Sequence, residues 1–330
     1  MPKTVVSATV IEDAVHLAGR APSYHNTQPW SWVVDRDGLQ LFVDPDRVAA
    51  SDRGGRQALI SCGAALDHLR VAMAAAGHES YVDYYPNPNS YKHIAAINFT
   101  PLRYVTRSHR ERADAILRRR TDRLPFAAPA NWDEFEVMMR KAVGDGVAVV
   151  DVVGERDRPD LAQASDLTEA LRLYDSAYHA EMNWWTAPYE VSDGIPHSAL
   201  VSASESDRVD VGRNFPVTHH EERRTEVGDD RSTILVISAL DDVRRDVLGC
   251  GETLSAVLLE ATMAGLATCT LSHMTEVTAA RDIVASITGH PNPEVLVRVG
   301  SVPVLEELPP PTPRRPLAEV LHFTPIQPVP

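Results

Sequence analysis

The sequence contains little lysine and little cysteine. Of its 330 residues, 32 are lysine or arginine, and only Lys3, Lys92 and Lys141 are lysine. It therefore has no Gly-Lys-Ser/Thr phosphate-binding loop and few candidates for a Schiff-base lysine. The three cysteines form no Cys-x-x-Cys pair and are odd in number, which argues against a disulfide framework and favours a reducing compartment.

The chain also lacks an excess of positive charge and long apolar runs. Its formal net charge is −14, so general binding to nucleic acid or to an anionic membrane is not expected, although a local basic cluster could hold one phosphate. The first residues lack the apolar core of a signal peptide, and no apolar run approaches the ~18 residues of a membrane span. These absences favour a soluble, cytoplasmic protein that binds neither nucleic acid nor membrane.

The composition is that of an ordinary globular protein. Hydrophobic residues make up 44% of the chain and charged residues 24%, which is enough apolar side chain for a large core. At roughly 100 to 200 residues per domain, the length corresponds to about two domains. Periodicity predicts, among other elements, a helix over 9–18 capped by Thr9, a hairpin of strands 30–34 and 39–43, and a helix over 159–180.

The sequence contains an internal repeat. The stretch from Ser61 to Gly77 matches the stretch from Gly249 to Gly265 at a constant offset of 188, with a Cys, a Gly, a Leu and the terminal Gly identical. Chance similarity between two Ala- and Leu-rich helices is one explanation. The other is that the chain fuses two copies of one protomer, residues 1–107 and 108–330, whose two apolar helices pack together at the centre.

Three segments carry residue types suited to holding a small molecule. Residues 21–30 (Ala-Pro-Ser-Tyr-His-Asn-Thr-Gln-Pro-Trp) form a polar turn, whose Ser and Asn side chains either satisfy local backbone groups or contact a ligand. Residues 118–126 open with three arginines, and residues 313–316 contain two more. Such arginines are either solvated cations at a helix end or a phosphate site, because a guanidinium donates two parallel hydrogen bonds to phosphate oxygens.

Two long stretches show no periodicity. Residues 186–230 are rich in Ser, Asp, Glu, Arg and His, and so long an irregular segment is typical of a lid, a binding loop or disorder. Residues 303–330 hold 9 of the 24 prolines, which predicts an extended tail that wraps over the protein or hangs free. Residues 219–222 (His-His-Glu-Glu) have no spaced Cys or His partner, so no metal site is expected.

Together these segments resemble the FMN-dependent nitroreductase superfamily. Its subunits begin with an Arg-x-Ser-x-Arg/Lys phosphate motif, continue to an Ala/Ser-Pro-Ser-x-x-Asn-x-Gln-Pro-Trp turn and end in a Lys/Arg-rich tail. The turn at 21–30 is the most specific match, and the resemblance to a fused, two-half actinobacterial branch associated with dormancy runs almost end to end. It implies an α+β fold in which two fused halves mimic the family homodimer, so that one chain acts as a monomer.

The resemblance further implies one FMN per chain, held between the halves, with NAD(P)H as a candidate reductant. In the family, one subunit supplies the phosphate motif, a loop beside flavin N5 and the tail, and the other supplies the turn. The residues carried over are Pro22, Ser23, Tyr24 and Asn26 from the first half, and Arg119, Arg120, Thr121, Arg123, Leu271, Ser272, His273, Arg314 and Arg315 from the second. The mirror site is expected to be vacant, because no Arg-x-Ser-x-Arg precedes the first turn.

The same resemblance implies a role for each group. The arginines at 119 and 120, with one from the tail, would neutralise the phosphate, and Thr121 would donate its hydroxyl in place of the usual Ser. Arg123 would lie near N1 and O2 of the flavin, where positive charge stabilises the reduced anion. Ser272 and His273 stand where many relatives place an acidic residue and a glycine, so the hydrogen bond to N5 is expected to differ.

Two functions fit these expectations. One is an enzyme that takes hydride from NAD(P)H and reduces a nitroaromatic, a quinone or a similar acceptor. The other is a protein that stores or sequesters FMN without turnover, with residues 186–230 folded over the ring as a lid. A single retained site favours the second as the physiological role.

Overall fold

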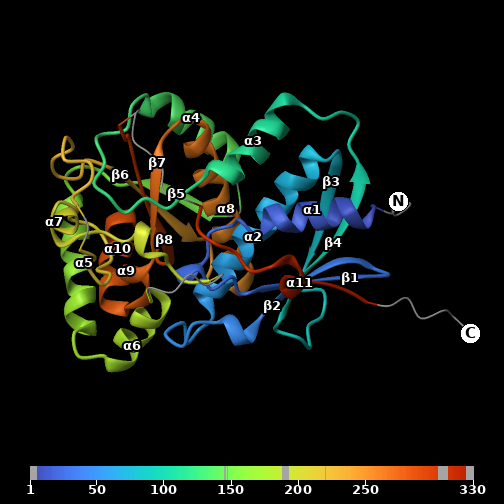
Figure 1. The fold of residues 1–330 in the computed structure, drawn as a ribbon, viewed down its shortest axis with the longest axis horizontal. Coiled ribbons are helices and arrows are strands. Elements are labelled where there is room, and N and C mark those ends of the chain that lie inside the picture. Colours follow the sequence, from blue (N-terminus) through green and yellow to red (C-terminus); the bar gives the residue numbers. More distant parts are fainter. Residues whose placement is uncertain are drawn as a thin grey trace, which may run out of the picture.

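The protein is built from two mixed layers of strands and helices around a central helix pair (Figure 1). The computed structural model describes residues 6–144, 146, 148–187, 193–219, 221–303 and 311–324. The helices are α1 (Ala8–Ala18), α2 (Arg56–Ala75), α3 (Arg107–Arg118), α4 (Trp132–Val143), α5 (Arg158–Arg172), α6 (Ser176–Trp185), α7 (Ala203–Asp207), α8 (Arg244–Met263), α9 (His273–Glu276), α10 (Thr278–Thr288) and α11 (Leu317–Val320). Parts of the expected lid (188–192 and 220) and tail (304–310 and 325–330) lie outside the described residues.

The two sheets repeat one strand order. The first has the order β3-β4-β2-β1-β9 and the second β7-β8-β6-β5, and every pairing is antiparallel except that of β9 with β1. Their strands are β1 (Trp30–Asp35), β2 (Gly38–Val43), β3 (His78–Tyr84), β4 (His93–Pro101), β5 (Ala148–Val152), β6 (Thr233–Ala239), β7 (Ala267–Leu271), β8 (Pro293–Gly300) and β9 (Leu321–Phe323). The antiparallel-rich α+β architecture expected from the sequence is therefore confirmed.

The two repeat helices, α2 and α8, pack against each other between the sheets (Figure 1). Most residues of each helix are buried, which explains why apolar side chains occur around most of the circumference of both. On α2, Asp67 accepts a hydrogen bond of 2.6 Å from Ser255 of α8, and 255 is 67 shifted by the repeat offset of 188. The contact therefore joins positions that the sequence repeat relates to each other.

The described part of the C-terminal tail beyond residue 310 lies against the first sheet. Residues 311–316 run over the end of α1, and β9 then adds a parallel strand to β1, with Trp32 opposite Leu321 (Figure 1). The described part of the tail thus wraps over the protein. Its strand pairing joins the end of the chain to the first half.

Two details differ from the sequence expectations. The first helix is capped by Ser7, whose side chain accepts a hydrogen bond from the Val10 amide. The prediction that Thr9 caps this helix was therefore wrong. The helix expected over 159–180 is two helices, because Asp175 caps a new start by accepting from the Tyr178 amide. Among the described residues, α2 alone is long and apolar enough to span a membrane by length and composition, and 78% of that window is buried inside the protein.

Candidate functional site

One cavity brings together the three segments selected from the sequence. Its empty volume is about 1410 Å³, part of it open to solvent. Eleven of the thirteen expected site residues line it, namely Pro22, Ser23, Tyr24, Asn26, Arg119, Arg120, Thr121, Arg123, Leu271, Ser272 and Arg314. The cavity lies between the first-half turn, the end of α3, the end of β7, residues 194–215 and the tail.

The turn at 21–30 is locally strained. His25, Asn26 and Gln28 have φ values of 48°, 59° and 52°, which non-glycine residues adopt at a cost. The Ser23 hydroxyl accepts from the Gln28 amide at 3.1 Å, so one predicted site side chain helps to hold the turn. Such strain is typical of a functional site whose surroundings enforce the geometry.

Asn26 ties the turn to two distant segments. Its side-chain amide donates to the carbonyl oxygen of Gly194 at 2.9 Å and to that of Pro313 at 3.2 Å. Gly194 has a φ of 77°, and a Cβ there would crowd the Trp185 backbone. The start of the irregular segment and the tail therefore meet at this one side chain.

Four arginines gather at one end of the cavity: Arg20, Arg119, Arg120 and Arg314. Their guanidinium groups donate to main-chain carbonyl oxygens, as from Arg119 to Arg20 at 3.2 Å and from Arg314 to Gly19 at 3.0 Å. In the described part of the chain, no carboxylate forms an ion pair with any of the four. The Nε atoms of Arg119 and Arg120 are buried and have no hydrogen-bond partner among the described residues.

This cluster is electrostatically unbalanced. Burial, together with the neighbouring charges of Arg20 and Arg120, lowers the pKa of Arg119 to about 10. Burial and the charges of Arg119, Arg20 and Arg120 also place the pKa of Arg314 well below its usual range. Packed cations without counter-charges, with donors left unpaired, form a site to which an anion such as a phosphate can bind favourably.

The other end of the cavity is aromatic and cationic. The Arg123 guanidinium lies 4.8 Å from the centre of the Phe215 ring, and Phe215 meets His25 edge to face at 6.3 Å between ring centres. Arg213 lies 5.3 Å from the centre of the Tyr24 ring and forms an ion pair with Glu276. These groups suit a flat aromatic ligand, because rings and guanidinium planes both stack on its face.

The end of β7 contributes backbone and one hydroxyl to this region. Leu271 and Ser272 line the cavity, and the Ser272 hydroxyl donates to Glu276 at 2.9 Å. His273 does not line it. Its ring is fully buried behind the loop and contacts the Ser165 hydroxyl at 2.9 Å through Nε2.

Arg315 is the second expected residue outside the lining. Its guanidinium donates to the Gln28 carbonyl oxygen and to Asp44, both at 3.2 Å, and its amide donates to the Gln28 side chain at 2.8 Å. Arg315 therefore fastens the tail to the first-half turn. Arg314, its neighbour, is the tail arginine that reaches the cavity.

Much of the segment expected to be a lid lines the cavity. Gly194, Ile195, Pro196, Ala199, Val201, Ser206, Val209, Gly212, Arg213, Asn214 and Phe215 all contribute. The segment starts beside the first half, where Arg47 forms an ion pair with Asp193. It covers one wall of the cavity from there to Phe215.

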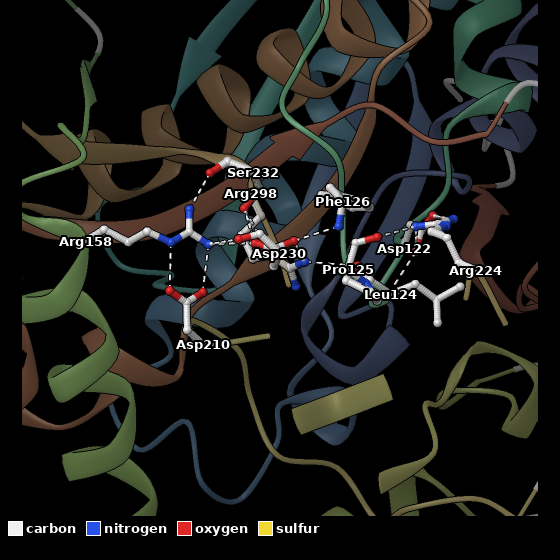
Figure 2. Close-up of polar contacts among 10 residues, drawn as sticks. All are labelled: Asp122, Leu124, Pro125, Phe126, Arg158, Asp210, Arg224, Asp230, Ser232 and Arg298. Atoms are coloured by element: carbon white, nitrogen blue, oxygen red, sulfur yellow. Dashed lines mark hydrogen bonds and ion pairs between the residues drawn. The ribbon is translucent and has the colours of Figure 1, made fainter. Parts of the chain in front are cut away.

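The far end of the segment is fixed by a buried ion network (Figure 2). Asp230 has no exposed side-chain surface and pairs with Arg298 of β8 at 2.5 Å and with Arg158 of α5 at 2.8 Å. Arg224 pairs with Asp122 at 2.7 Å, within the arginine-rich segment 118–126. The Phe126 amide also donates to Asp230. The network therefore links the stretch around Phe126 to the segment 186–230 and to the sheet that contains β8.

Sequence reasoning missed several lining residues, notably Arg20, Gln57, Arg213 and Phe215. Arg20 directly precedes the turn at 21–30, but its contacts with Arg119, Thr312 and Arg314 arise only in the folded chain. Arg213 and Phe215 lie in an aperiodic stretch that offered no signal. No group of His, Cys, Asp and Glu suited to a metal occurs among the described residues, and His220 of the 219–222 quartet lies outside them.

Comparison with known proteins places the chain in a family. No family model matches the chain. It is similar to "Putative NAD(P)H nitroreductase acg" of Mycobacterium tuberculosis, with 58% identity over 324 residues that cover 98% of each chain. A second "Putative NAD(P)H nitroreductase" of that organism is 34% identical over 321 residues, 96% of this chain and 92% of the relative.

Solved structures give weaker matches. The FMN-dependent nitroreductase NfnB of Mycobacterium smegmatis, solved in complex with NADPH, is 16% identical, with a TM-score of 0.39 over 66% of this chain and 99% of that chain. A nitroreductase of Bacteroides fragilis with bound FMN is 14% identical, with a TM-score of 0.37 over 61% and 92%. It is the full-length identity to the mycobacterial relatives that decides the family: the chain belongs to the nitroreductase superfamily.

Proposed function

We propose that the protein is an FMN-binding nitroreductase-like flavoprotein with one FMN site per chain. The observation that carries the proposal is a cluster of four cavity-lining arginines that form no ion pair with any carboxylate of the described residues. Their buried, unpaired donors fit the phosphate of FMN. When bound, FMN would supply hydride and electron transfer, with NAD(P)H as the reductant expected from the family.

Different residues of the chain would hold different parts of the cofactor. Arg119, Arg120 and Arg314 would hold the phosphate, and Thr121 would add its hydroxyl. Arg123, which has no carboxylate partner among the described residues, would place positive charge at the pyrimidine edge of the ring. Pro22, Ser23, Tyr24 and Asn26 would border the ring from the first-half turn.

The position related to the cavity by the repeat offset supports a single site. The repeat offset of 188 relates Gln57 and Ser272 of the cavity to Arg245 and Tyr84. There the Arg245 guanidinium lies 3.6 Å from the centre of the Tyr84 ring, and both side chains bond to buried Glu252. These side chains occupy the position related to the cavity by the repeat, which supports one FMN per chain and a chain that by itself mimics a dimer.

The segment from Gly194 to Phe215 supports storage of FMN as the physiological role. It lines the cavity and is fixed at both ends, by Asn26 and Arg47 at the start and by the Asp230 network beyond its end. A lid anchored in this way would limit the access of a reductant or an acceptor to the ring. Turnover of nitroaromatics or quinones with NAD(P)H is the second candidate, favoured by the family to which the chain belongs.

Stopped-flow reduction of the flavin separates the two candidates. Deleting all of 186–230 would remove buried Asp230 and unfold the protein, so the informative variant is Phe215→Ala, with exposed Val217→Ala as its matched control. For storage we expect slow bleaching of the wild-type flavin by NADPH and NADH, faster bleaching of Phe215→Ala and no change in Val217→Ala. Rapid reduction of the wild type would contradict an occluding lid and favour the enzyme. Cytoplasmic location and the two-half origin stay predictions from the sequence.

A further inference from the structure

Arg20 occupies a place in the arginine cluster that no sequence motif assigns. It follows the C-terminal end of α1 and lines the cavity beside the phosphate-motif arginines. Its carbonyl oxygen accepts from Arg119 at 3.2 Å and from Arg314 at 3.3 Å. Its own guanidinium donates to the carbonyl oxygen of Thr312 in the tail at 3.0 Å. Three segments far apart in the sequence therefore meet at this residue.

The cluster carries four positive charges, contributed by the first half, by the end of α3 and by the tail. In the part of the chain that the structure describes, none is offset by an ion pair with a carboxylate. Arg119 is 5% exposed, and its Nε, with that of Arg120, lacks a partner. Like charges held this close repel one another, so the protein without a ligand is destabilised at this point.

We propose that Arg20 is a fourth phosphate-binding arginine and that the cluster selects a phosphate dianion, which neutralises it and fastens the tail to both halves. The proposal rests on the FMN site proposed above and adds that the phosphate provides most of the affinity for FMN. A dianion interacts with all four cations, whereas an uncharged flavin interacts with none of them. Riboflavin, which has the same ring without the phosphate, should therefore bind far more weakly than FMN.

The test compares Arg20→Gln and Arg20→Lys with Arg118→Gln. Arg118 belongs to the same arginine run but is exposed and does not line the cavity, so it is a matched control for net charge. Three probes are titrated into the protein freed of bound flavin: FMN, riboflavin and inorganic phosphate. The readouts are the dissociation constants of the two flavins and the melting temperature of the protein with and without phosphate.

For Arg20→Gln we expect FMN affinity to fall at least about tenfold, riboflavin affinity to stay unchanged, and stabilisation by phosphate to shrink. The ligand-free variant should melt no lower than the wild type, because a repelling charge has been removed. A purely structural Arg20 would instead lower that melting temperature. Arg20→Lys should retain part of the affinity, and Arg118→Gln should match the wild type.

The outcomes separate this inference from the proposed function. If the wild type binds FMN and Arg20→Gln binds it within about twofold as tightly, the inference is overturned while the FMN site stands. If FMN does not bind but phosphate raises the melting temperature in a manner that depends on Arg20, the dianion site stands and the proposed function fails. If neither FMN nor phosphate acts on the wild type, both are overturned.

Discussion

Gly63 of α2 and Gly251 of α8 face each other where the two helices cross. A Cβ at Gly63 would collide with the carbonyl oxygen of Leu248, and a Cβ at Gly251 would collide with that of Ile60. The contacts are reciprocal, since 248 and 251 are 60 and 63 shifted by 188. Each helix thus depends on a glycine in the other for its close approach.

We expect Gly63→Ala and Gly251→Ala each to lower the free energy of unfolding by about 3 kcal/mol or more, because the obstacle is backbone and cannot rotate away. Urea unfolding followed by circular dichroism measures this. Gly228→Ala is the matched control, because a Cβ there meets nothing within 4 Å. Equal stability of Gly63→Ala and the control would contradict the crossing described.

The buried ion network predicts an asymmetry between two aspartates. Replacing Asp230 by Ala leaves Arg298, which is 1% exposed, without its carboxylate, so the free energy of unfolding should fall by about 3 to 5 kcal/mol. Asp210 is 43% exposed, and its partner Arg158 keeps Asp230, so Asp210→Ala should cost less than about 1 kcal/mol. Thermal or urea unfolding of both variants checks the difference. Similar losses in the two would show that burial does not control this network.

His68 predicts a pH dependence of stability. It is fully buried on α2, and neither ring nitrogen has a hydrogen-bond partner within the described part of the chain. Burial, with the nearby Arg119 and Arg314 charges, puts its pKa well below the usual value. In the unfolded chain His68 binds a proton near pH 6.5, whereas in the folded protein it stays neutral to a lower pH. The stabilisation by neutral His68 is therefore fully present above pH 6.5 and is lost as the pH falls below it.

His68→Leu should therefore flatten the fall of stability with acid below pH 6.5, by up to about 1.4 kcal/mol per pH unit. At pH 7.5 it should not destabilise the protein, because no hydrogen bond is removed. Urea midpoints between pH 5 and 7.5 give the slope. His25 and His273 are also buried with lowered pKa values, so part of the acid dependence should remain. An unchanged slope in His68→Leu would contradict the neutral, buried ring.

The phosphate assignment predicts the effect of removing two arginines at once. Arg119→Ala with Arg314→Ala takes away two charge-assisted contacts, so the dissociation constant of FMN should rise at least about 100-fold. Fluorescence quenching of added FMN measures it, with Arg118→Ala as the control that changes charge outside the cavity. Normal FMN affinity in the double variant would contradict the assignment of these arginines to the phosphate.

The sequence predicted the parts of the site that depend on local motifs. The turn at 21–30 and the run after Arg118 were found because their residue types follow from short-range chemistry, and the repeat predicted the central helix pair. Arg20 and Phe215 were missed because each acquires its neighbours only through the tertiary fold, Arg20 from a tail 292 residues away. The Thr9 cap failed because Ser7, two residues earlier, satisfies the amide at the helix start.

Calorimetric titration of FMN into the ligand-free protein measures the number of FMN sites per chain. We expect one, because the arginine cluster lines the cavity, whereas at the position related to it by the repeat the Arg245 guanidinium lies over the Tyr84 ring. Two equivalents of FMN per chain, or none, would contradict this expectation.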